Sequence, residues 1–388
     1  MKKTILRFLV IVLFVQSQGL NTYASESSNS VLNAEKIFDQ ASLLDMDSLE
    51  NLLESGRLSQ EQHDNYMDIL ESGGDTLRVT IPKDRLLTPE QELLVNETQI
   101  KDISAATTVQ ELQKFAETQV AGYGQWGFSL VYIGNNGIRK DLTSLNQHIK
   151  IRPASTMKLF SANLAYDRKA YSQSNLGLLL QKSKNGMADA ALRATANLQP
   201  NYRVPEGSYL RHPDLLNYKM YDSTENKNQI IDLSILRGCS MMNTEYAGLE
   251  DSSKFHPVNG SGLQVTGKDT DLQTNTVTPR LQTALLERIL SNKTKYEKYK
   301  NLLTSPGKAG GTLTSAFTQG RKLAKIYAKT GTLGNGKALA GFAETKNGVL
   351  VFSIISDKLR ALSTTEALKG PIENIVYNHL AYLKAKGL

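Results

Sequence analysis

Two polar side chains three residues apart give the strongest chemical signal in the sequence. Residues 153–160 read PASTMKLF, and on a helix Ser155 and Lys158 share one face, which brings the amine near the hydroxyl. A desolvated lysine can be neutral enough to take the serine proton, which turns the hydroxyl into a nucleophile. The pair therefore predicts acyl transfer, with Ser155 as the nucleophile and Lys158 as the base. The same S-x-x-K spacing recurs at 305–308 in a turn-like context, and a helix cap beside a solvated lysine is the alternative.

A Lys-Thr-Gly tripeptide downstream supplies a second element. It occurs once, at 329–331, where a strand is expected to end, and Thr332 follows it. Lys329 can hold a substrate carboxylate or tune the proton network, and the hydroxyls of Thr330 and Thr332 can bind that carboxylate. Gly331 has no side chain, so a ligand can lie close to the strand. An ordinary strand followed by a glycine turn is the alternative, which the upstream S-x-x-K disfavours.

A third element, S-x-N, is expected between these two. Ser183-Lys184-Asn185 follows the S-x-x-K pair on a loop between two expected helices, where both polar side chains can face the cleft. Ser183 can relay a proton to the leaving group, while Asn185 can bind the substrate amide and orient Lys158. A helix cap is the alternative, and the choice of segment stays open because the pattern is common. It matches at 27–29, 144–146, 161–163 and 183–185.

The N-terminus has the layout of a secretory signal peptide, predicted to span residues 1–24. It starts with basic residues, continues with an apolar run from Phe8 to Val15, and ends at Ala24 before Ser25. The run is too short to cross a bilayer. We therefore expect export to the periplasm or the medium and no transmembrane segment after removal of the signal, with an uncleaved anchor as the alternative.

Composition disfavours several classes of function. The chain has 388 residues and a formal net charge of +7, of which Lys2, Lys3 and Arg7 supply +3, leaving +4 after the leader. A mildly basic exported protein can stay near anionic envelope polymers. No dense Lys/Arg stripe with aromatic residues indicates nucleic acid, and no His/Cys cluster predicts a metal or other cofactor. The single cysteine, Cys239, excludes an internal disulfide and is expected to be a buried thiol.

The order of expected elements indicates an α/β fold of the α+β type. Residues 25–105 read as a helical accessory region, with helices expected near 44–53 and 61–70, and 106–388 as the catalytic domain. Strands at both ends of that domain, with helices between them, imply an antiparallel sheet that the chain leaves and rejoins. The expected strands are 126–133, 138 onward, 325–332, 338–345 and 349–356. The expected helices include 109–120, 155–166 and 364–384, the last interrupted at Gly370-Pro371.

The three elements in this order resemble the penicillin-recognising serine enzymes, which are the β-lactamases and penicillin-binding proteins. Further segments narrow the similarity to the class C low-molecular-weight penicillin-binding proteins, D-Ala-D-Ala carboxypeptidases and endopeptidases of peptidoglycan. The resemblance covers roughly residues 125–357. The additional matching segments are 259–263 (NGSGL), 277–280 (VTPR), 310–313 (GGTL) and 338–342 (ALAGF).

The resemblance implies a β-lactamase/transpeptidase-like antiparallel sheet flanked by helices, and no cofactor. The implied substrates are peptidoglycan stem peptides, with β-lactams as covalent inhibitors that acylate Ser155. Backbone N–H groups of Ser155 and Thr332 would form the oxyanion hole. The proton for the departing D-alanine would pass through Ser183 and Lys158.

Three departures from the family pattern bear on substrate preference and activity. Only residues 159–182 separate Lys158 from Ser183, so the large insertion of many relatives is absent. The second departure is in two residues: Asn259 replaces the usual Asp before Gly-Ser-Gly-Leu, and Lys184 replaces the frequent Asp of the S-x-N element. The third is the accessory region before residue 105, which is not part of the family pattern. The alternatives are a serine β-lactamase, although no Glu-bearing loop to activate water stands out, and a weak or inactive peptidoglycan-binding relative. A Ser-His-Asp hydrolase is disfavoured because no G-x-S-x-G occurs.

Overall fold

The computed structural model describes residues 42–44, 77–79, 106–121, 124–222, 227–263, 272–358 and 368–388. The predicted leader lies outside these residues. So do the helices expected in the accessory region, of which only a pair of short antiparallel strands is described, β1 (Ser42–Leu44) and β2 (Leu77–Val79). Across the described ranges, no helix combines the length and apolar character needed to cross a membrane.

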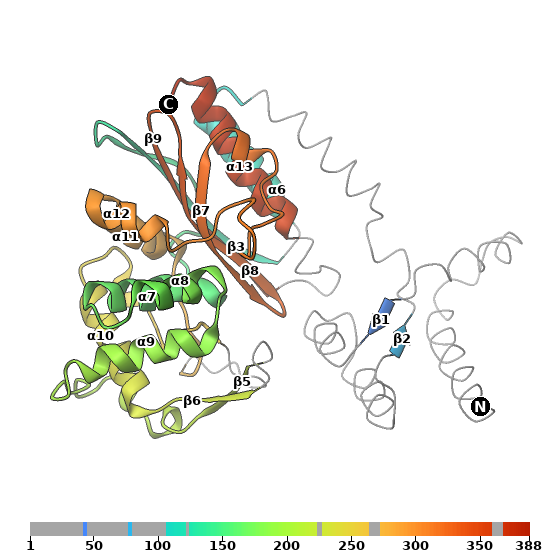
Figure 1. Cartoon of the computed structure of the whole chain (residues 1–388). Coiled ribbons are helices and arrows are strands. Elements are labelled where there is room, and N and C mark those ends of the chain that lie inside the picture. Colours follow the sequence, from blue (N-terminus) through green and yellow to red (C-terminus); the bar gives the residue numbers. More distant parts are fainter. Residues whose placement is uncertain are drawn as a thin grey trace, which may run out of the picture.

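A five-stranded antiparallel sheet is the centre of the catalytic domain (Figure 1). Its order is β4-β3-β9-β8-β7, so strands from the two ends of the domain pair at its middle, where β3 and β9 align from Gln125↔Asp357 to Gly134↔Gly348. The predicted strands and the antiparallel class are confirmed. The strands are β3 (Gln125–Gly134), β4 (Arg139–Leu145), β7 (Lys325–Leu333), β8 (Gly336–Glu344) and β9 (Gly348–Asp357).

Both faces of this sheet are buried, which explains its nearly continuous apolar strands. Successive side chains of a strand point to opposite faces. In β9, Val351 and Ile355 therefore enter the core on the side of the central helices, while Leu350, Phe352 and Ile354 enter the second core. The sheet consequently separates two hydrophobic cores.

Two helices cover the second core, α6 (Val109–Val120) and α13 (Lys369–Ala385), which lie side by side in Figure 1. The start of α6 is fixed by a capping box between Thr108 and Glu111. The interruption predicted at Gly370-Pro371 is wrong. The described helix begins at Lys369, so Pro371 lies in the first turn, where a missing N–H costs no helical hydrogen bond.

The opposite face carries α11 (Pro279–Leu290) directly on the sheet and a helical region beyond it (Figure 1). Cys239 is buried within α10, as expected for an inert thiol, and burial raises its pKa well above the usual value. The remaining elements of this region are α7 (Lys158–Asp167), α8 (Gln173–Gln181), α9 (Asn185–Asn197), α10 (Leu233–Tyr246), α12 (Lys293–Lys300), β5 (Lys219–Asp222) and β6 (Lys227–Ile230).

One glycine fixes how the loop at 259–263 meets the rest of the domain. Gly262 has φ +82°, and a Cβ built there would lie 1.9 Å from the carbonyl oxygen of Ala154. We expect Gly262→Ala to lower the free energy of unfolding in urea by about 3 kcal/mol or more, because backbone must shift and the left-handed conformation is strained.

Gly207 provides the matched control, since it has φ +74° but no atom within 4 Å of a built Cβ. Gly207→Ala should cost only about 1 kcal/mol, which is the conformational penalty alone. Equal losses in the two variants would contradict a steric role for Gly262.

Candidate active site

The predicted nucleophile lies on a tight turn rather than on a regular α-helix. Residues Ala154–Met157 form a 3₁₀ turn, and α7 begins at Lys158. In a 3₁₀ turn, side chains at i and i+3 eclipse one another. Lys158 Nζ accordingly lies 2.7 Å from Ser155 Oγ, with Ser155 partly accessible and Lys158 fully buried.

The turn has a strained backbone, and hydrogen bonds to α11 and β9 hold it in place. Ala154, immediately before the serine, has φ +48°, a conformation that non-glycine residues adopt only when the surroundings impose it. Thr156 Oγ1 donates to the Pro153 carbonyl at 2.6 Å and accepts a 2.7 Å hydrogen bond from Gln282 on α11. Gln282 in turn accepts a hydrogen bond from Ser353 on β9 at 2.8 Å. The sheet thereby fixes the position of the serine.

The contacts of Lys158 Nζ suit a neutral amine that acts as a base. Besides Ser155 Oγ, it contacts Asn185 Oδ1 at 2.6 Å and the Ser261 carbonyl oxygen at 2.9 Å. Both oxygens only accept hydrogen bonds. A neutral amine has two hydrogens and one lone pair, so its hydrogens satisfy the two carbonyl groups. In that state its lone pair can accept a hydrogen bond from the Ser155 hydroxyl, 2.7 Å away.

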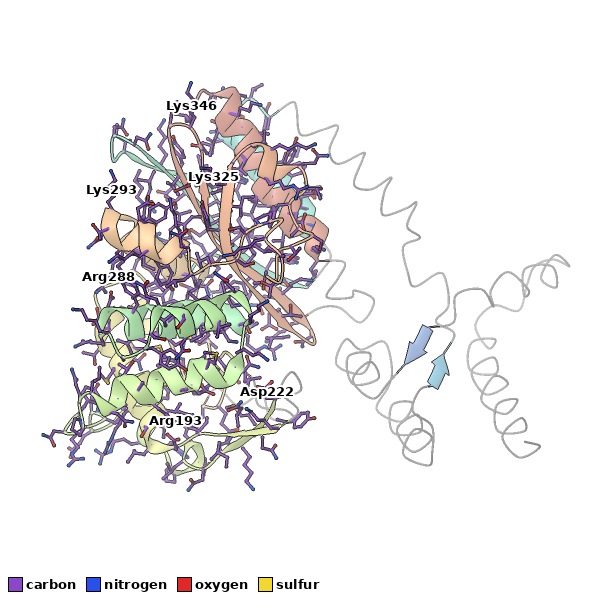
Figure 2. All side chains as sticks on the ribbon, viewed as in Figure 1. Arg193, Asp222, Arg288, Lys293, Lys325 and Lys346 are labelled. Carbon is purple, nitrogen blue, oxygen red and sulfur yellow. The ribbon has the colours of Figure 1, made fainter. Side chains whose placement is uncertain are left out.

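A buried carboxylate fixes the orientation of the Asn185 amide. Asn185 Nδ2 donates to Asp222 Oδ1 at 2.9 Å, which leaves Oδ1 of the amide facing Lys158. Asp222 is fully buried at the end of β5, and its second oxygen accepts from Gln229 on β6 at 3.3 Å. Figure 2 shows Asp222 on the side of the β5–β6 hairpin. No local pattern indicated Asp222, because only the fold of this hairpin brings it to Asn185.

The second lysine pairs with the second serine. Lys329 Nζ donates to Ser183 Oγ at 2.9 Å and to the Thr330 carbonyl at 2.6 Å. Its side chain is fully buried, and burial together with the charge of Lys158 holds the pKa of Lys329 well below its usual value. Of the two roles open to Lys329, this environment favours tuning the Ser183 proton over an ion pair with substrate.

Around the Lys-Thr-Gly segment, β7 packs against the nucleophile turn. A Cβ on Gly331 would lie 2.9 Å from the Pro153 carbonyl oxygen and 3.1 Å from the Ser155 nitrogen. The missing side chain therefore lets the strand approach the turn, a different reason from the ligand contact expected from the sequence. Thr332 is exposed, while Thr330 Oγ1 donates to Thr312 Oγ1 at 2.8 Å. Thr312 lies in the 310–313 segment, which sequence reasoning noted without giving it a role.

The hydrogen bonds of Asn259, in the loop at 259–263, give a reason for the asparagine that replaces the usual aspartate. Asn259 Oδ1 accepts from the backbone N–H groups of Ser261 and Gly262 at 3.1 and 2.8 Å. Its Nδ2 donates to the Leu263 carbonyl at 3.0 Å, a bond that an aspartate cannot make. Asn259 thus holds the Ser261 carbonyl against Lys158.

Asp189 supports this loop from α9. Its Oδ1 accepts from the Gly260 N–H at 2.9 Å, and its Oδ2 is buried with no hydrogen-bond partner in the described part of the chain. Burial raises the pKa of Asp189 to about 6, against the opposing effects of the Gly260 N–H and the charges of Arg193 and Lys158. The carboxyl therefore titrates at mildly acidic pH.

Because the folded state raises this pKa, Asp189 stabilises the fold most when it is protonated. Its contribution is complete below about pH 4 and is lost as the pH rises through about 6, a change of about 3 kcal/mol for a shift of this size. Asp189→Asn should keep the Gly260 bond and remove this loss. Urea unfolding from pH 4 to 7 should then show the variant gaining stability relative to wild type, and parallel curves would contradict the assignment.

The comparisons with known proteins agree with this arrangement at the level of the superfamily. Residues 251–375, about a third of the chain, match the model of the D-Ala-D-Ala carboxypeptidase 3 (S13) family. A search of curated proteins found no match. The matched segment contains the 259–263 loop and Lys329-Thr330-Gly331.

Solved structures similar to this chain include a β-lactamase from Chitinophaga pinensis and a D-alanyl-D-alanine carboxypeptidase from Mycobacterium tuberculosis. The first is 14% identical, with 71% of this chain and 98% of the other covered and a TM-score of 0.45. The second is 15% identical, with 65% and 89% covered and a TM-score of 0.40. Scores this low carry no weight beside the family match.

The family match, the five-stranded antiparallel sheet and the hydrogen bonds that join residues of all three sequence elements agree with one another. These findings support the superfamily of penicillin-recognising serine hydrolases, on the family match over residues 251–375.

Proposed function

We propose that the chain is an exported serine-type D-Ala-D-Ala carboxypeptidase of the class C type, acting on peptidoglycan stem peptides and inhibited by β-lactams. The observation that carries this proposal is the hydrogen-bonded set of Ser155, Lys158 and Asn185, beside the Ser183–Lys329 pair. The match to the S13 carboxypeptidase family supports the substrate class. The same chemistry on a cross-linked peptide would make the enzyme an endopeptidase.

In the acylation step, Ser155 Oγ attacks the carbonyl carbon of the penultimate D-alanine. Its proton passes to the lone pair of Lys158, 2.7 Å away. The oxygen of the tetrahedral intermediate lies between the backbone N–H groups of Ser155 and Thr332. The close approach of β7 to the nucleophile turn at Gly331 supports this pairing of donors.

Collapse of the intermediate breaks the C–N bond and releases the terminal D-alanine. The leaving nitrogen needs a proton, which Ser183 supplies while its own hydroxyl is replenished from the lysines. The hydrogen bond from Lys329 to Ser183 supports that relay. The hydroxyls of Thr330 and Thr332 bind the terminal carboxylate. Water then attacks the acyl-enzyme, with Lys158 as base, and restores the Ser155 hydroxyl.

Labelling with a fluorescent penicillin tests the nucleophile. We expect one covalent adduct on the wild-type protein and none on Ser155→Ala, because Ser155 is the proposed nucleophile and Lys158 lies 2.7 Å from its hydroxyl. Ser305→Ala is the matched control, since Ser305 also begins an S-x-x-K segment, and it should label as wild type does. A correctly folded wild-type protein that never labels would contradict an acyl-enzyme mechanism and favour a binding role.

Product analysis separates the activities that share this acylation chemistry. A carboxypeptidase should release D-alanine from a pentapeptide, and an endopeptidase should divide cross-linked dimers of stem peptides. Rapid turnover of nitrocefin without release of D-alanine would instead indicate a β-lactamase.

Removing the charge of Asp222 tests whether the orientation of Asn185 matters. In Asp222→Asn, the new amide can donate as well as accept, so Asn185 is free to turn its Nδ2 toward the lone pair of Lys158. The rate constant of acylation should fall by about 10- to 100-fold, as expected for misplaced groups in an active site. The rising limb of the pH profile should move to lower pH, because loss of a nearby negative charge favours the neutral amine.

Asp214→Asn, which removes an exposed carboxylate, should leave both the rate constant and the pH profile unchanged. Melting temperatures of the two variants show whether a fall in the acylation rate constant of Asp222→Asn comes from unfolding. A normal pH profile and rate constant in Asp222→Asn would show that Asp222 does not orient Asn185 for catalysis and has only a structural role.

A further inference from the structure

A broad groove lies at the other end of β7 from the predicted catalytic residues. It has a volume of about 1290 Å³, and Lys325, the first residue of β7, lines it. The groove is lined by the turns that join β3 to β4 and β8 to β9, by the end of α11 and the start of α12, and by residues 321–325. In Figure 2, Lys293, Lys325 and Lys346 approach this region from three different elements.

Positive charge dominates the lining of this groove. It contains seven cationic side chains and three acidic ones, a net of 7 − 3 = +4, compared with +7 for the whole chain. The cationic residues are Arg139, Arg288, Lys293, Arg321, Lys322, Lys325 and Lys346, and the acidic ones are Glu287, Glu297 and Glu344.

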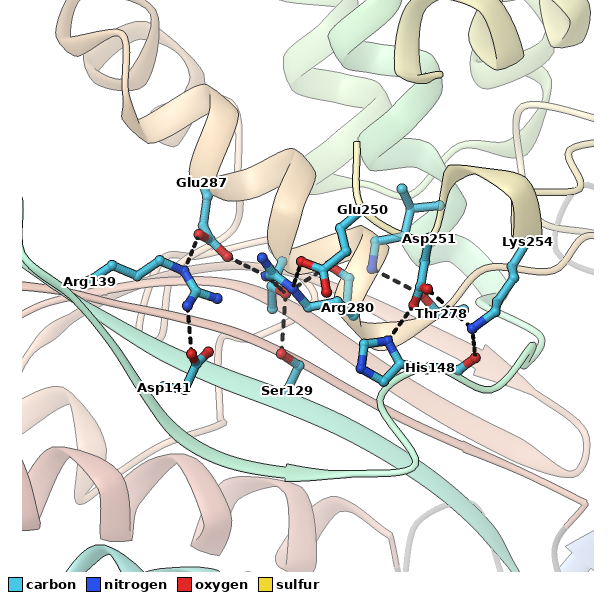
Figure 3. Close-up of polar contacts among 12 residues, drawn as sticks. Ser129, Arg139, Asp141, His148, Glu250, Asp251, Lys254, Thr278, Arg280 and Glu287 are labelled. Atoms are coloured by element: carbon cyan, nitrogen blue, oxygen red, sulfur yellow. Dashed lines mark hydrogen bonds and ion pairs between the residues drawn. The ribbon is translucent and has the colours of Figure 1, made fainter. Parts of the chain in front are cut away.

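The acidic residues are already used by ion pairs within the protein. Glu287 binds Arg139 at 2.7 Å and Arg280 at 2.5 Å, as Figure 3 shows. Glu297 and Glu344 both bind Lys300, at 3.0 and 2.6 Å. Of the lining cations, Arg139 therefore pairs with Glu287, and Arg288 pairs with Glu245 outside the groove.

Five lining cations form no ion pair with any residue that the structure describes. All five are exposed, and they come from α12, from the turn before β7, from β7 itself and from the β8–β9 turn. They are Lys293, Arg321, Lys322, Lys325 and Lys346. Like charges gathered in one groove repel each other, so a bound anion would relieve that repulsion.

We propose that this groove binds an extended polyphosphate chain, a linear polymer of phosphate groups without bases. Such a chain carries closely spaced charges that match cations spread over several elements. Arginine and lysine both contact phosphate oxygens, Arg321 in a forked geometry and the lysines as point charges. The one aromatic residue of the lining, Tyr296, is buried, so no exposed ring can stack a nucleic-acid base. This inference does not depend on the proposed peptidase activity.

Fluorescence anisotropy of labelled inorganic polyphosphate against the full chain tests the proposal. Replacing Lys293, Lys325 and Lys346 by Gln should weaken binding by at least about tenfold. The slope of log Kd against log salt concentration should fall by about 2, because each lost phosphate contact removes roughly 0.7 of the slope. Melting temperatures establish that the variant is folded.

A control variant removes the same charge elsewhere, with Lys114, Lys169 and Lys219 each changed to Gln. All three are exposed and lie outside the groove, so binding should change by less than about twofold. Equal losses in the two variants would overturn the site. Equally tight binding of polyglutamate, or displacement of polyphosphate by single-stranded DNA or by anionic vesicles, would overturn the assignment to a polyphosphate chain.

Discussion

The site depends on one buried amine. Lys158 has no access to water, and its nitrogen is surrounded by two carbonyl acceptors and the hydroxyl of Ser155. Burying a charged ammonium without a paired anion is costly, whereas a neutral amine with two acceptors and a hydroxyl donor is fully satisfied. The rest of the local structure keeps those three partners where they are. Asp222 orients the Asn185 amide, and Asn259 holds the Ser261 carbonyl.

A second buried lysine makes this balance possible. Two ammonium groups close together in one dry site would repel each other, and the pKa of Lys329 is lowered by burial and by the charge of Lys158. The nearby carboxyl groups of Asp222 and Asp189 limit how much positive charge the site has to carry without a partner. Asp189, with its pKa near 6, is the member whose charge changes most readily. The site is therefore a coupled set of groups rather than a serine with one base.

Sequence patterns predicted the sheet well because each strand and turn is indicated by residues that are neighbours in the chain. Runs of apolar, β-forming residues and the turns at 135–137 and 347–348 predicted the strands to within two residues. The spacing of Ser155 and Lys158 predicted their contact, although the turn is 3₁₀ rather than α-helical. The packing of Gly331 against the nucleophile turn was not predicted, because that turn lies about 175 residues earlier in the chain, a long-range contact that no local pattern encodes.

The same limit explains why Asp222 escaped prediction. It is an ordinary residue of a short strand whose sequence resembles many surface hairpins, and only the packing of β5 and β6 near α9 makes its carboxylate part of the site. Asn259 was visible as a departure from the family, but its meaning required the acceptor at Leu263. Motifs thus identify the groups that touch the reacting atoms. The residues that orient those groups are selected by tertiary contacts and so can be recognised only in the folded chain.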